Sequence, residues 1–187
     1  MKNKFILHGG FNKARGLVQE SDEFFQEMLK DTLEEVKILL VYFAEREEMI
    51  ETRIEQDKEQ FSKNNKESKK LNFKVASEEN FEEGCVWADI IYLHGGRTKK
   101  LIDVLRKYPN IKEMLSNKII GGDSAGANVL GQLFYSKNSK EIGEGLSILP
   151  FKIVVHYKDG TPNPLADVKP ELQTIFLHEY ETKVFYL

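Results

Sequence analysis

The chain is predicted to adopt an α/β fold, a three-layer α/β/α sandwich with a mostly parallel central sheet. Short apolar runs alternate along it with longer amphipathic segments, which is the pattern of repeated strand and helix units. Two of these runs, 36–44 and 88–93, are almost continuously apolar, as expected for strands that helices bury on both faces. The 187 residues are enough for one substantial core, so we expect residues 1–187 to form a single domain.

Each element follows from its local pattern. The first strand is the apolar run 5–7, and apolar residues at helical spacing then predict a helix over 21–33 with Leu33 on its buried face. The strand 36–44 is followed by a charged helix over 46–63 that has one apolar stripe, and by a strand over 71–75. After the strand 88–93, Thr98 is placed to cap a helix. The run 118–120 then predicts a strand, and the segment 127–134 can be helical.

Composition narrows the classes of function. A formal net charge of -3 gives no basic field for nucleic acid, and no apolar run approaches the ~20 residues that cross a membrane. The apolar run after Lys4 is too short for the core of a signal peptide, and a single cysteine, Cys85, excludes an internal disulfide. We therefore expect a cytoplasmic protein that acts on small molecules or on a small peptide substrate, without nucleic-acid or membrane partners. A homodimer is compatible with this composition.

Glycine pairs follow two of the predicted strands. His8-Gly9-Gly10 comes after the first strand, and His94-Gly95-Gly96 comes after the strand 88–93. Ligands of open parallel sheets bind at the carboxyl ends of the strands, where paired glycines let backbone amides approach a ligand closely. Neither the dinucleotide-binding G-x-G-x-x-G pattern nor a P-loop occurs, and H-E-x-x-H is absent. We therefore expect no cofactor and no metal.

The segment Gly122-Asp123-Ser124-Ala125-Gly126 has the form of a nucleophile elbow. In such an elbow a serine lies on a tight turn between a strand and a helix, and larger neighbours than glycine would collide with either element. The turn exposes the Ser124 hydroxyl and leaves the Ala125 amide free at the helix start, where it can stabilise an oxyanion. Cys85 lacks such a setting and is predicted to be a packed residue.

A serine nucleophile needs a base, and histidine is the usual one. His156 ends the apolar run 151–155, which places it at the carboxyl end of a strand and on the same rim as Ser124. A third group, a carboxylate, would orient the imidazole. The two acids between Ser124 and His156 are Glu141 and Glu144. We prefer Glu141, and both can equally be surface glutamates.

Three motifs in this order make the chain resemble peptidase family S51, which includes aspartyl dipeptidase and cyanophycinase. They are Y-x-x-G-G-x-T over 92–98, G-x-S-A-G-A over 122–127, and G-L-x-x-L-P followed by an H-Y pair over 145–157. The resemblance also extends to the wider class I glutamine amidotransferase-like fold. It implies a serine peptidase with Ser124 as nucleophile, His156 as base, and the amides of Ala125 and Gly96 as oxyanion donors.

The same resemblance assigns Gly95, Arg97 and Thr98 to the substrate-binding loop. Arg97 stands where the dipeptidase-like pattern has asparagine, so aspartyl specificity does not carry over. Two other functions fit the same residues: an esterase, which normally needs a longer chain after its nucleophile, and a non-catalytic protein whose glycine-rich rim binds a small anion.

Overall fold

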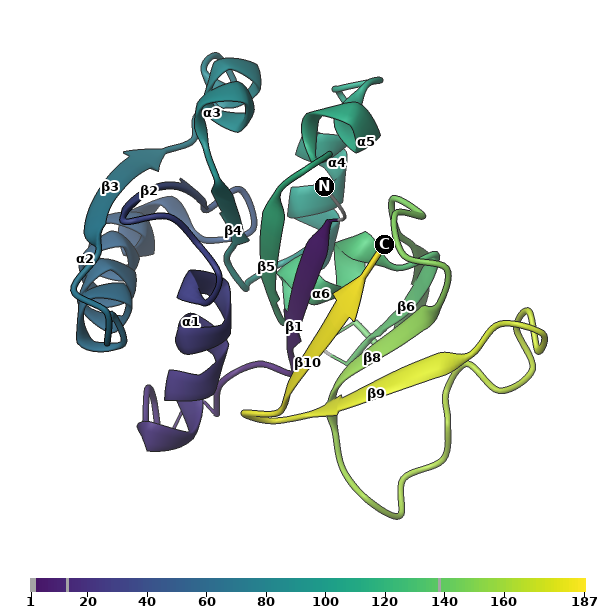
Figure 1. Cartoon of the computed structure of the whole chain (residues 1–187). Helices are drawn as coiled ribbons and strands as arrows, with labels where there is room; N and C mark the ends of the chain where they lie inside the picture. The colour runs from purple at the N-terminus through teal and green to yellow at the C-terminus, as the bar shows by residue number, and fades with distance from the viewer. Residues whose placement is uncertain (1–2, 13, 138) are drawn as a thin grey trace.

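A six-stranded sheet forms the centre of the computed structural model, which describes residues 3–12, 14–137 and 139–187 (Figure 1). Its strand order is β10-β1-β5-β4-β2-β3, and every neighbouring pair is parallel except β1 and β10. The bounds are β1 Lys4–His8, β2 Glu35–Val41, β3 Lys70–Val75, β4 Ile90–Leu93, β5 Ile119–Asp123 and β10 Thr182–Tyr186. The chain therefore has the predicted α/β architecture with a mostly parallel sheet.

Helices cover both faces of this sheet, as the strand and helix alternation predicts. One face packs against α1 (Asp22–Leu29) and α2 (Glu47–Lys63), whose Phe24, Phe25 and Phe61 are fully buried. The other face packs against α3 (Phe81–Trp87), α4 (Thr98–Leu105), α5 (Ile111–Met114) and α6 (Ala125–Leu130). Because side chains alternate along a strand, Ile6 of β1 belongs to the first cluster and its neighbours to the second. The short 3-10 helix η1 (Gln19–Ser21) leads into α1.

A second, four-stranded sheet holds the later part of the chain in the order β7-β6-β8-β9. Its strands are β6 Leu133–Ser136, β7 Glu141–Glu144, β8 Lys152–Tyr157 and β9 Thr174–His178. β7 is antiparallel to β6, whereas β8 is parallel to both β6 and β9. A turn over 179–181 then joins β9 to β10, so the last hairpin connects the two sheets (Figure 1).

Three local expectations were wrong. The segment 127–134 is not one helix, because α6 ends at Leu130 and the extended backbone of Gly131 leads into β6. Leu33 lies beyond α1 and is 79% exposed, since the helix ends before Asp31, which has a positive φ of 64°. Thr98 is the first residue of α4 rather than its cap, a position that Arg97 occupies. None of the described helices is long and apolar enough to cross a membrane.

Candidate active site

Ser124 lies on a strained turn between β5 and α6. Its φ of 47° and ψ of -99° are outside the regions that residues other than glycine favour, and its amide donates to the His8 carbonyl at 3.0 Å. The turn is this tight because α6 packs directly on β4: a β-carbon at Gly126 would overlap with the carbonyl oxygen of Leu93. The backbone therefore has the geometry expected of a nucleophile elbow.

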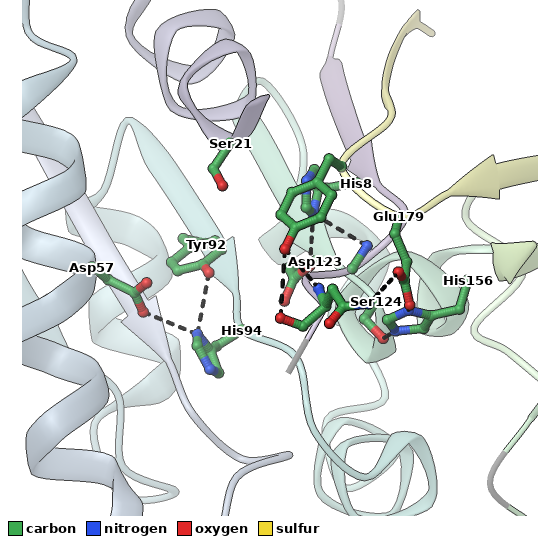
Figure 2. A network of polar contacts seen from close by, with 12 residues as sticks. His8, Ser21, Asp57, Tyr92, His94, Asp123, Ser124, His156 and Glu179 are labelled. Atoms are coloured by element: carbon green, nitrogen blue, oxygen red, sulfur yellow. Dashed lines mark hydrogen bonds and ion pairs between the residues drawn. The ribbon is translucent and has the colours of Figure 1, made fainter. Parts of the chain in front are cut away.

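The imidazole of His156 is directly in front of this serine. Its Nε2 atom is 3.0 Å from the Ser124 Oγ atom, within the range of a hydrogen bond (Figure 2). His156 belongs to β8, where a register shift and a positive φ of 51° turn its side chain out of the regular ladder. Its amide donates to the Gly9 carbonyl at 3.0 Å, so the last residue of β1 and the loop after it hold the two residues of the pair.

The carboxylate beside the imidazole is that of Glu179, not that of Glu141. Glu179 Oε1 is 3.4 Å from His156 Nδ1, and the two side chains are 30% and 25% exposed. Glu141 and Glu144 instead lie at the two ends of β7, both exposed, where they pair with Ser136 and Leu133 of β6. The expectation of Glu141 was wrong because it assumed an acid between serine and histidine, whereas β9 returns the chain to the site after His156.

Two neighbours hold Glu179 in place. Asn12 Nδ2 donates to Glu179 Oε2 at 2.9 Å, which leaves the other carboxylate oxygen facing the histidine. The backbone amide of Asn12 in turn donates to the Tyr180 hydroxyl at 3.1 Å. The backbone amide of Tyr180 donates to the Gly10 carbonyl at 3.0 Å. The hydrogen bond from Asn12, reinforced by His156, keeps the pKa of Glu179 below its usual value. The carboxyl group is therefore ionised at neutral pH.

A signal for Glu179 was present in the sequence. The cluster His178-Glu179-Tyr180-Glu181 directly follows the apolar run 175–177, so it lies at the end of a strand, as Ser124 does. In the structure His178 and Glu181 pair with each other at 2.8 Å, which leaves Glu179 as the member that turns towards His156.

Gly96 and Ala125 are the two candidate oxyanion donors. Ala125 is the first residue of α6, and Gly96 has a φ of 138°, a conformation that suits glycine. A β-carbon on Gly96 would also overlap with the Ala44 carbonyl, so the loop after β4 is packed closely on the loop after β2. Among the residues that the structure describes, neither amide donates to another protein group. Both remain available to a ligand.

The other predicted substrate-binding residues have different environments. Gly95 is buried against Asp123, which itself bonds to His8 Nδ1 at 2.8 Å. Arg97 is exposed, and its side chain has no ion pair with any described residue. Thr98 is buried, and its hydroxyl accepts a hydrogen bond from Asn128 Nδ2 at 3.3 Å, so it joins α4 to α6.

Cys85 is remote from this chemistry. It is a buried free thiol on α3, as predicted, and burial raises its pKa to about 12. A thiol with so high a pKa is not a nucleophile at neutral pH. Among residues 3–12, 14–137 and 139–187, no group of three or more histidine, cysteine or acidic side chains is arranged to hold a metal ion.

Comparisons with known proteins support the fold and give the family. A peptidase from an acI-B1 actinobacterium aligns with a TM-score of 0.66 and 22% identity over 99% of this chain and 84% of its own. A putative peptidase E protein from Listeria monocytogenes EGD-e aligns with a TM-score of 0.67 and 16% identity over 100% and 98%. No curated protein matches significantly. The model of peptidase family S51 matches residues 5–183, which supports a peptidase, and the chain belongs to that family.

Proposed function

We propose that the protein is a serine-type peptidase or amidase that hydrolyses short peptides through an acyl-enzyme on Ser124. The observation that carries this proposal is the 3.0 Å contact between Ser124 Oγ and His156 Nε2, on a serine with strained backbone angles. Strain of this kind needs support from the surrounding structure, and it is concentrated at functional sites. Membership of a peptidase family gives the reaction class.

The reaction follows from the placement of these groups. His156 Nε2 accepts the hydroxyl proton of Ser124 as Oγ attacks the carbonyl carbon of the scissile bond. The carbonyl oxygen becomes an oxyanion, and the amides of Ala125 and Gly96 donate to it. The histidine then delivers its proton to the leaving amine as the carbon–nitrogen bond breaks. Water, deprotonated by the same histidine, attacks the ester, and Ser124 is released with its proton restored.

Glu179 acts on the histidine in this scheme. An ionised carboxylate beside Nδ1 keeps the proton of the neutral imidazole on that nitrogen, so that Nε2 is free to accept. It also stabilises the imidazolium that forms in each half of the reaction. The 3.4 Å separation is longer than an ordinary hydrogen bond, and such contacts often tighten only when substrate binds.

A fluorophosphonate probe tests the proposal directly, because it reacts with activated serines whatever the natural substrate is. Wild-type protein should be labelled covalently, and Ser124→Ala should abolish labelling because the reacting oxygen is gone. His156→Ala should slow labelling by roughly 10²–10⁴-fold, the usual contribution of a general base. Labelling that is absent from the wild type, or that persists in Ser124→Ala, would overturn the assignment.

A panel of di- and tripeptides and matched esters then defines the substrate. Turnover of peptides, lost in Ser124→Ala, is the expected result. Hydrolysis of esters alone would identify an esterase instead, and reversible binding without turnover would identify a non-catalytic ligand-binding protein.

A further inference from the structure

A buried histidine that the proposed reaction does not use lies beside the oxyanion loop. His94 follows the last residue of β4 and directly precedes Gly95 and Gly96. Its side chain is only 9% exposed, and its Nδ1 atom is 2.9 Å from Asp57 Oδ2 and 3.1 Å from the Tyr92 hydroxyl (Figure 2). Asp57 projects from α2, the helix that covers this part of the sheet, and is itself buried.

Further charged groups lie near this imidazole. Glu45 Oε2, in the loop after β2, is 3.8 Å from His94 Nε2, and Arg53 of α2 is paired with that same glutamate. Tyr42, directly after β2, donates its hydroxyl to Asp57 at 2.8 Å. On the other side, Asp123 of β5 is close enough to act on the histidine electrostatically.

The balance of these groups favours the charged form of His94. Burial opposes the charge, but Asp57, Glu45 and Asp123 outweigh it and raise the pKa of His94 to about 9. The histidine in turn lowers the pKa of Glu45 to about 2. At neutral pH the ring is therefore an imidazolium.

A structural role alone does not account for this arrangement. Burying an ion pair costs a large desolvation penalty, and an apolar contact would join α2 to the sheet as well or better. The position of the charge is specific, however. β4 is the neighbour of β5 in the sheet, so the end of β4 lies next to the serine, and two residues of backbone span at most ~7 Å from His94 to Gly96.

We propose that His94 is a positioning residue for the oxyanion loop: its buried contact with Asp57 fixes the loop 94–96 and so holds the Gly96 amide in place. The inference rests on the proposed function, because it needs an oxyanion to form at Ser124. An amide that is already held in place stabilises an oxyanion effectively, because it requires no rearrangement during the reaction.

The pH dependence of labelling separates this role from a structural one. The rate of fluorophosphonate labelling should fall on the alkaline side with an apparent pKa near 9, in step with the titration of the His94 ring followed by NMR. Asp57→Asn removes the counter-ion, so burial then lowers the pKa of His94. The alkaline limb of the labelling rate should move at least one pH unit lower. His94→Gln should remove the limb and slow the covalent step by roughly 10–100-fold, with little change in probe affinity.

Tyr108→Phe is the matched control. Tyr108 also has a raised pKa, but its hydroxyl bonds to the Glu78 carbonyl on another part of the surface, so its alkaline limb should equal that of the wild type.

The outcomes are distinct. If wild-type labelling does not depend on Ser124, the proposed function fails and this inference fails with it. If labelling depends on Ser124 but its alkaline limb does not coincide with the His94 titration, the inference alone is overturned; this comparison needs only wild-type protein. A folded Asp57→Asn variant with an unmoved limb would overturn it equally.

Discussion

Gly10 lies against the ring of His156, so closely that a β-carbon at residue 10 would overlap with the imidazole Cε1 and Nε2 atoms. The same hypothetical carbon would be 3.1 Å from Ser124 Cβ, and Gly10 has a φ of 99°. The loop after β1 thus packs directly against the proposed nucleophile and base. The glycine pair after the first strand was predicted to approach a ligand, and the structure shows that it approaches the histidine instead.

Gly10→Ala should therefore displace the imidazole and slow fluorophosphonate labelling by about 100-fold or more, since small misplacements of reacting groups are costly. Gly160→Ala is the matched control: Gly160 also has a positive φ, of 78°, but nothing lies within 4 Å of its hypothetical β-carbon. It shares the backbone strain without the collision. Equal labelling rates in the two variants, both folded by circular dichroism, would mean that the contact with His156 is unimportant.

Glu179→Gln tests the third member of the proposed triad. The amide keeps the shape of the side chain but has no charge to hold the imidazolium, so peptide turnover should fall by roughly 10²–10⁴-fold. Glu141→Gln and Glu144→Gln are controls of the same chemistry on the exposed strand β7, and both should match the wild type. Steady-state kinetics on a cleaved peptide gives the comparison. A loss in Glu141→Gln equal to that in Glu179→Gln would contradict the placement of the acid.

The contrast between Ser124 and Glu179 explains what could be predicted from the sequence. Ser124 could be found from its glycine-rich elbow just after an apolar run, and His156 because it directly follows one. Both therefore lie at the carboxyl ends of strands, on one rim of the sheet. Glu179 follows an apolar run as well, but its contact depends on how a second sheet folds back beside the first, which no local pattern records. Similarly, 127–134 has helical composition, but the extended backbone of Gly131 ends α6 and leads into β6.

Buried polar groups were the other part that the sequence did not reveal. Asp57 lies in a strongly charged helix, where one acid among many gives no sign that it faces inward. Its partner His94 was recognised only as the residue before a glycine pair. Their contact joins residues 37 positions apart and became visible only with the fold.

The stability of the protein should depend on pH through His94. Its pKa is raised in the folded state to about 9 from an ordinary 6.5, so its stabilising contribution is complete below pH 6.5 and is lost as the pH rises through 9. The free energy of unfolding should therefore fall over this range by at most roughly 3 kcal/mol from this group. Urea denaturation at pH 6, 7.5 and 9 measures the loss. His94→Gln should be less stable at pH 6 but should show a flatter profile, and a parallel profile would contradict the charged state of the histidine.

Gly126→Ala should destabilise the fold although alanine is the better helix former. In an exposed helix this change would add up to ~1 kcal/mol of stability. Here the new β-carbon would overlap with the backbone carbonyl of Leu93, which cannot move without distorting β4, so we expect a loss of roughly 1–3 kcal/mol. Gly84→Ala on α3 is the comparison, since its β-carbon would meet only the flexible end of Leu39, at 2.8 Å. Chemical denaturation gives the free energy of unfolding of both variants. If Gly126→Ala is at least as stable as Gly84→Ala, the close packing of α6 on β4 does not explain why the elbow has glycine at this position.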